Sequence, residues 1–144
     1  MPSDLTRFLP YLLNQASELV SAKFQPSYRE GYGMLRTEWR VLFHLGHRGD
    51  MTAKDICTQA ILHKTKVSRA VHALQDKGYL RRQTSPDDRR VEWLSLTSKG
   101  KLVFNDLSGA AIQFEHNMAE QLTTAELEQL RSLLLKVIRS NSPR

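Results

Sequence analysis

The chain of 144 residues has little cysteine and no long apolar run. Its single cysteine, Cys57, excludes an internal disulfide framework and a cysteine-rich zinc site. No apolar stretch approaches the roughly 20 residues that a membrane-spanning helix needs. The amino-terminal sequence MPSDLTRFLPYLLNQ also lacks the basic-then-apolar layout of a signal peptide. We therefore expect a cytoplasmic protein with no membrane partner.

The sequence also lacks the motifs of common catalytic sites. It contains no G-x-S-x-G, no phosphate-binding P-loop, no H-E-x-x-H and no G-x-G-x-x-G. Cys57 and the scattered histidines do not form a recognisable pair of nucleophile and base. The sequence therefore predicts a protein that is not an enzyme and that uses no cofactor.

Positive charge is concentrated in the middle of the chain. Residues 36–101 carry 14 Lys and Arg against seven Asp and Glu, a net charge of +7, whereas the two flanks together carry −1. A basic block between near-neutral arms indicates one element that meets a polyanion. A solvated basic surface without a partner is the alternative that charge alone leaves open.

Apolar residues repeat with a helical period in six stretches, at residues 5–24, 36–45, 53–60, 64–77, 97–120 and from 124 onward. The first helix is expected to start near Pro10, and Pro26, Gly31 and Gly33 to break or kink the chain before the second. Gly46 and Gly49 are predicted to end that second helix. Trp39, Leu42, Phe43 and Leu45 are expected to face inward from it.

Local signals mark other boundaries. Capping boxes begin the third and last helices, at Thr52–Asp55 and Thr123–Glu126, and Gly78 is placed as a left-handed residue after the fourth. Residues 79–83 and 91–96 alternate with period 2 around a polar turn at 84–90, which predicts a hairpin with a basic tip. The fold class expected is mostly α with a small β-hairpin wing.

Two short helices, a tight connection, a helix with an outward polar face and a hairpin together predict a winged helix-turn-helix. Such a helix can present its polar face to the major groove of DNA. The outward residues of the stretch 64–77 are Thr65, Lys66, Ser68, Arg69 and His72. A generic amphipathic helix with a solvated face is the alternative, and the basic hairpin argues against it because it has no evident packing role.

The run from Thr65 to Val71, followed by Leu74, Lys77-Gly78 and Leu80, resembles the recognition helix of the MarR (multiple antibiotic resistance regulator) family. The run Asp87-Asp88-Arg89-Arg90 through Leu96-Thr97-Ser98-Lys99-Gly100 is similar to that family's wing signature, D-x-R followed by L-T-x-x-G. The resemblance implies an amino-terminal dimerisation segment at 1–35, a DNA-binding lobe at 36–101 and carboxyl-terminal dimerisation helices at 102–144.

The resemblance further implies a homodimeric regulator of repressor type on a pseudo-palindromic operator in duplex DNA. It places Arg89 in the minor groove with Asp87 steadying its guanidinium, and Arg90 with Arg81 or Arg82 on phosphates. Many members bind small aromatic acids or phenols. His63 departs from the Asp or Ser that often caps the recognition helix in this family, and Leu35 from a Thr or Ser cap on the second helix.

The sequence independently favours a dimer, because the amphipathic first and last helices carry more apolar surface than one small lobe covers. An ordinary core is the alternative for these helices. An effector pocket is expected among aromatic residues near one cation, with Tyr11, Arg36, Trp39 and Phe43 as its members and Tyr28, Tyr32 and Met34 nearby. Core packing is the alternative for Trp39 and Phe43.

Three further hypotheses stay open. Cys57 is a candidate redox sensor, although its place beside Ile56 and Ala60 favours a buried structural thiol. His44 and His47, one helical turn apart, are a candidate start of a metal site, against solvent-facing histidines. The third hypothesis is a winged-helix domain that binds protein instead of DNA. A DNA affinity that falls steeply with salt would argue against it.

Overall fold

The computed structural model describes residues 4–143, which fall into two compact units, one extending to Ser108 and the other starting at Gly109. The chain is mostly helical (71%) with a small antiparallel sheet, which confirms the predicted fold class. Among the described residues, no helix combines the length and apolarity required to cross a bilayer.

The first long helix, α1 (Leu9–Tyr32), follows a 3-10 turn, η1 (Leu5–Arg7). Pro10 lies in its first turn, as expected. The chain breaks at Gly33, whose φ is 65°, within the segment predicted to break it, but the expected end of the first helix before Pro26 is wrong, because α1 continues through this proline. An internal proline removes one hydrogen bond and costs about 3 kcal/mol. Packing of Tyr28, which is 2% exposed, offsets that loss beyond the proline.

Helix α2 (Arg36–Arg48) ends at Gly49, so the prediction that Gly46 helps to end it is wrong. Gly46 lies inside the helix, where a Cβ would overlap the ring of Phe104. Leu42 and Leu45 are buried as predicted, whereas Phe43 is 37% exposed and does not face the core. The buried positions that the sequence pattern missed on this helix are Glu38 and Val41.

A short strand, β1 (Met51–Thr52), and helix α3 (Ala53–Ala60) follow. The Thr52–Asp55 capping box is confirmed: the Asp55 backbone N–H donates to Thr52 Oγ1 at 3.1 Å, and the Thr52 N–H donates to the Asp55 carboxylate at 3.2 Å. Helix α4 (Lys64–Asp76) comes next, and Gly78 has the predicted left-handed φ, 79°.

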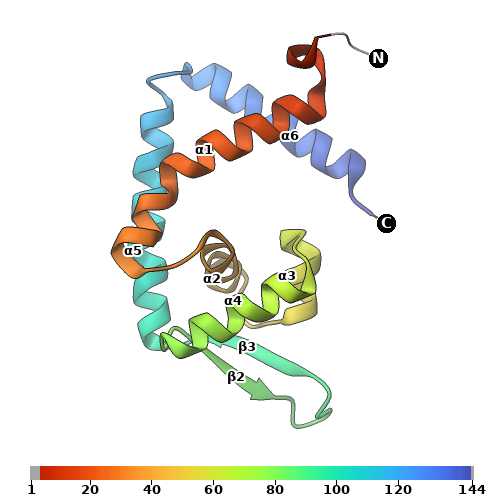
Figure 1. Cartoon of the computed structure of the whole chain (residues 1–144), viewed down its shortest axis with the longest axis vertical. Helices are drawn as coiled ribbons and strands as arrows, with labels where there is room; N and C mark the ends of the chain where they lie inside the picture. The colour runs from red at the N-terminus through yellow and green to blue at the C-terminus, as the bar shows by residue number, and fades with distance from the viewer. Residues whose placement is uncertain (1–3, 144) are drawn as a thin grey trace. The chain divides into compact units, whose positions relative to one another are not determined.

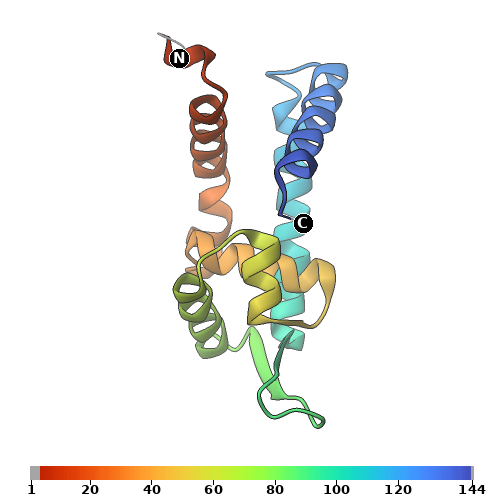
Figure 2. The ribbon, with the colours of Figure 1, turned by 90° about the vertical axis from the view of Figure 1, so that its right-hand side faces the viewer.

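The hairpin consists of β2 (Leu80–Thr84) and β3 (Glu92–Leu96), and β1 joins it to give the order β1-β3-β2. Figures 1 and 2 both show the hairpin projecting away from α2, α3 and α4. The two remaining helices are α5 (Ser98–Met118) and α6 (Thr124–Asn141), the latter opened by the predicted Thr123–Glu126 capping box.

Candidate nucleic-acid interface

Helix α4 separates its apolar and polar residues cleanly. Its apolar stripe is buried in the core of the lobe and consists of Val67, Ala70, Val71 and Leu74. The five residues predicted to face outward are all exposed: Thr65, Lys66, Ser68, Arg69 and His72. The helix is therefore anchored by one side, and its opposite side offers hydrogen-bond donors and positive charge to a partner.

His63 caps α4, although it is not one of the Asp or Ser residues expected at this position. His63 adopts an extended backbone, and its Nδ1 accepts a hydrogen bond from the Thr65 backbone N–H at 3.2 Å. This bond requires the neutral ring, because a protonated imidazole has no lone pair to offer and opposes the helix dipole. The start of the recognition helix is thus held by a histidine acting as acceptor.

The tip of the wing is closed by Asp88 and Arg90. The Arg90 guanidinium donates to both Asp88 carboxylate oxygens, at 3.1 and 3.2 Å, and the Arg90 backbone N–H adds a bond of 3.0 Å. These bonds hold the pKa of Asp88 below its ordinary value. Asp87 and Arg89 are exposed, and neither makes a hydrogen bond or ion pair within residues 4–143. The predicted contact of Asp87 with Arg89 is therefore absent from the free chain.

Adjacent arginines on β2 lie on opposite faces of the hairpin, because side chains alternate along a strand. Arg82 Nε donates to Gln75 Oε1 of α4 at 2.8 Å, and its Nη1 donates to Glu92 Oε1 of β3 at 3.1 Å. Arg81 pairs across the strands with Ser95 and lines a cavity of about 330 Å³ with Lys101 and Asn105. Both arginines are exposed, but Arg82 connects the wing to α4, whereas the Arg81 side chain makes no hydrogen bond or ion pair within residues 4–143.

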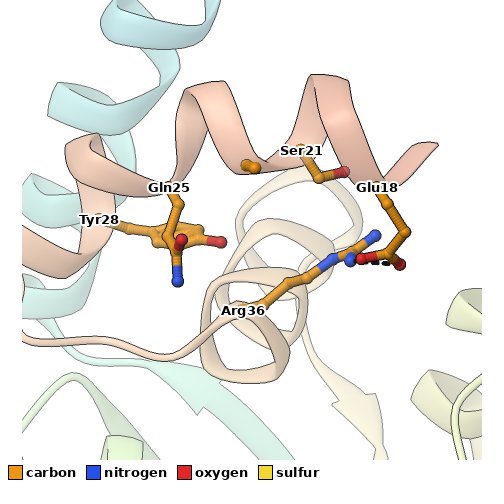
Figure 3. Close-up of a pocket in the computed structure, with 6 residues that line it drawn as sticks. Glu18, Ser21, Gln25, Tyr28 and Arg36 are labelled. Atoms are coloured by element: carbon orange, nitrogen blue, oxygen red, sulfur yellow. Dashed lines mark hydrogen bonds and ion pairs between the residues drawn. The ribbon is translucent and has the colours of Figure 1, made fainter. Parts of the chain in front are cut away.

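The predicted effector residues do not share one cavity. Arg36 lines a cavity of about 220 Å³ between α1 and α2 with Glu18, Ser21, Ala22, Gln25 and Tyr28, as Figure 3 shows. Trp39 instead packs on Phe24 and Tyr28, with ring centroids 5.5 and 6.0 Å away. Phe43 lines a different cavity, and Tyr11 lines neither of them. Sequence reasoning missed Glu18, whose helical spacing from Ser21 and Gln25 was the available signal.

The sensing hypotheses gain no support from local geometry. His44 Nδ1 lies 2.8 Å from the Arg40 carbonyl oxygen, and the His47 ring packs against Phe43 with centroids 4.3 Å apart. No group of three metal-ligating side chains occurs within the described part of the chain. Cys57 is partly buried against the core, as a structural thiol would be.

An exposed polar helix anchored beside a basic antiparallel hairpin defines a winged helix-turn-helix of the DNA-binding class. Comparison with known proteins gives the family. The MarR family model matches residues 32–91. The transcriptional regulator MhqR of Bacillus subtilis is 31% identical over 106 residues, which cover 74% of this chain and 73% of MhqR. The chain belongs to the MarR family of transcriptional regulators.

Solved structures agree over the whole chain. The crystal structure of transcriptional regulator PA4135 has a TM-score of 0.86 at 28% identity and covers 99% of this chain and 100% of its own. NadR in complex with 4-hydroxyphenylacetate has a TM-score of 0.79 at 21% identity, covering 95% of this chain and 97% of its own. Bordetella bronchiseptica BpsR, regulated by 6-hydroxynicotinic acid, has a TM-score of 0.80 at 22%, covering 90% and 97%. The last two share the fold.

Proposed function

We propose that this protein is a homodimeric, sequence-specific repressor on a pseudo-palindromic operator, and that a small aromatic effector relieves repression. The observation that carries the proposal is the pairing of an exposed polar face on α4 with the basic wing beside it. A recognition helix in the major groove with a wing in the adjoining minor groove uses both surfaces at once.

Each DNA-facing residue has a proposed role. Arg69 grips a guanine edge bidentately, and Thr65, Lys66, Ser68 and His72 contact bases or phosphates from the same helix. Arg89 enters the minor groove, where Asp87 steadies its guanidinium once DNA is bound. Arg90 reaches a phosphate, and of the two arginines on β2 we assign Arg81 to this role, because Arg82 is already hydrogen-bonded to Gln75 and Glu92.

Uncovered apolar residues on the terminal helices support a homodimer. Helix α6 buries none of its residues, and its apolar side chains Leu130, Leu133 and Ile138 are 41–55% exposed. Helix α1 likewise leaves Leu12, which is 41% exposed, and Leu19, which is 65% exposed, uncovered. Exposed apolar surface on each of these helices marks an interaction site, and a second copy of the chain offers a matching one.

An effector response is supported by the ligands named for NadR and BpsR, both single-ring aromatic acids. The corresponding proposal for this chain places the effector carboxylate on Arg36, next to the aromatic cluster of Trp39, Tyr28 and Phe24. An arginine is the side chain best suited to a carboxylate, because its planar guanidinium donates two parallel hydrogen bonds.

Selection of bound sequences from a random pool of DNA duplexes tests the proposal, with stoichiometry measured by sedimentation. We expect a two-fold symmetric site occupied by two chains. Binding without enrichment of any sequence would replace the repressor by a nonspecific architectural role. Absence of binding at moderate salt would favour a winged-helix module that binds protein, whose contacts lack the steep salt dependence of phosphate neutralisation.

A further inference from the structure

The cavity between α1 and α2 contains polar groups that the chain itself leaves unused. The hydroxyls of Ser21 and Tyr28 and the amide of Gln25 line it, and none of them makes a hydrogen bond within residues 4–143. Tyr28 is 2% exposed, and burial raises the pKa of its hydroxyl. Figure 3 shows the side chains of Gln25 and Tyr28 both directed from α1 into the space between the two helices. Ser21 and Gln25 are half-buried, and with the Tyr28 hydroxyl they leave hydrogen-bonding capacity open to a ligand in this cavity.

The same cavity contains one residue of each charge among its described lining. Arg36 Nη1 donates to Glu18 Oε1 at 3.1 Å, at the opposite end of the cavity from Gln25. Their side chains are 39% and 62% exposed, so the pair is solvated and contributes little stability. A ligand can therefore separate the two side chains at low cost.

The presence of Glu18 determines which ligand charge is favoured. A simple carboxylate bound to Arg36 displaces Glu18 and leaves two anions side by side, which repel each other. An amine that pairs with Glu18 leaves Arg36 without an anionic partner. A ligand with both groups gives each side chain an opposite charge, and its remaining atoms lie toward Gln25 and Tyr28.

We propose that this cavity binds a compact zwitterion, an α-amino acid whose carboxylate pairs with Arg36 and whose ammonium pairs with Glu18. The volume of about 220 Å³ fits a small ligand rather than a drug-sized one. Ser21, one helical turn from Glu18, completes the hydrogen bonds of the charged groups, whereas Gln25 and Tyr28 line the end of the cavity that takes the side chain. This inference rests on the proposed effector response and names the chemical class of the effector.

Three probes that differ in their charged groups test whether the ligand is a zwitterion. L-phenylalanine carries both charges, 3-phenylpropanoate lacks the ammonium and 2-phenylethylamine lacks the carboxylate. Binding to the full chain is measured by calorimetry and by the shift in melting temperature. We expect L-phenylalanine to bind about tenfold or more tightly than either of the others, since each loses one charge-assisted hydrogen bond.

Variants then separate a binding role from a structural one. Glu18→Gln is expected to weaken the binding of L-phenylalanine, which loses the partner of its ammonium. It is expected to strengthen the binding of 3-phenylpropanoate, because the carboxylate that competes for Arg36 is gone. A merely structural role of Glu18 does not reverse the preference between two ligands. Glu30→Gln, the same change at an exposed position of the same helix, is the control and leaves both affinities unchanged.

The outcomes separate this inference from the proposed function. Tighter binding of 3-phenylpropanoate than of L-phenylalanine by the wild-type chain overturns the zwitterion, while the aromatic-acid effector stands. Equal affinity for the two, or no binding of any probe at millimolar concentration, also overturns it. Operator selection in the absence of ligand reports on the repressor independently, so a negative result here does not bear on DNA binding.

Discussion

The winged-helix lobe and the carboxyl-terminal helix differ in what they leave exposed. In the lobe, α4 buries the four side chains of its apolar stripe to 3% exposure or less and presents polar and cationic groups outward. Helix α6 also has an apolar stripe, yet it buries none of its residues. Both helices are amphipathic by sequence, so amphipathicity alone does not say what covers the apolar face. The apolar stripe of α4 is covered by its own chain, whereas α6 leaves Leu130, Leu133 and Ile138 41–55% exposed.

The largest expected effect is loss of the dimer when charge is placed on the apolar face of α6. Leu133 is 53% exposed in the single chain. Burial of a leucine contributes about 1.5–3 kcal/mol, and an unpaired buried carboxylate adds a larger penalty. Leu133→Glu is therefore expected to weaken dimerisation at least about 100-fold and to abolish operator binding, as measured by sedimentation and gel shift.

Ser132→Glu is the matched control, because it adds the same charge at an exposed polar position of α6 that is turned away from Leu130, Leu133 and Ile138. It is expected to leave the dimer intact. If Leu133→Glu remains dimeric, the exposed stripe of α6 is not the subunit interface, and the contrast between the lobe and this helix loses its explanation.

Arg89→Ala is expected to weaken operator binding by about 1–3 kcal/mol, because it removes the proposed minor-groove contact of each wing. Fold and dimer should not change, since Arg89 makes no hydrogen bond or ion pair among the described residues. Arg29→Ala, at an exposed position on α1, is the control. Unchanged affinity for the operator would remove the wing tip from the mechanism.

Arg69→Ala should relax the preference at one base pair of each half-site, at a cost of about 1–3 kcal/mol. The measurement compares the affinities of the variant and the wild type for all four base pairs at each operator position. Equal weakening on every sequence would assign Arg69 to a phosphate instead of a base.

Alanine substitutions of the two arginines of β2 are expected to change operator binding in different ways. Arg81→Ala should lower the slope of log K against log salt by about 1, because a phosphate contact is lost. Arg82→Ala should keep the slope and lose about 1 kcal/mol or less of affinity, because its bonds to Gln75 and Glu92 orient the wing against α4. A reduced slope for Arg82→Ala would mean that it leaves these partners for DNA.

Much of the fold follows from local signals in the sequence. The Thr52 and Thr123 capping boxes, the left-handed Gly78 and the outward face of α4 depend on residues within a few positions of each other. The predictions that were wrong concern residues whose conformation depends on partners distant in the sequence. The helix passes Pro26 because Tyr28 packs against Trp39 of another helix, and Gly46 lies mid-helix because Phe104 needs the space.

The candidate sites follow the same division. The exposed residues of α4 were predictable from periodicity, but the bond of Arg82 to Gln75 depends on strand register and on how the hairpin meets the helix. Glu38 shows the limit most clearly. A charged residue is expected on the surface, yet Glu38 is 5% exposed and pairs with Lys77 at 3.4 Å, a contact between α2 and the end of α4.

The smallest expected effect concerns the end of α1, where Tyr32 donates a hydrogen bond to Asp106 of α5. That bond to a carboxylate raises the pKa of Tyr32 from 10.0 to about 12. Because the folded-state pKa is the higher one, the stabilising contribution is complete below pH 10 and is lost as the pH rises toward 12. Tyr32→Phe is expected to cost about 1 kcal/mol at neutral pH, with little change in operator affinity.

Denaturant unfolding at a series of pH values checks this prediction, with Tyr11→Phe on the same helix as the control. The difference in unfolding free energy between wild type and Tyr32→Phe should shrink between pH 10 and 12, because the ionised tyrosine no longer donates to Asp106. No difference at any pH would mean that the ring of Tyr32, which phenylalanine keeps and which packs edge-on against Tyr79 at 6.5 Å, accounts for its contribution. The junction of α1 with the lobe would then depend on aromatic packing rather than on the hydrogen bond.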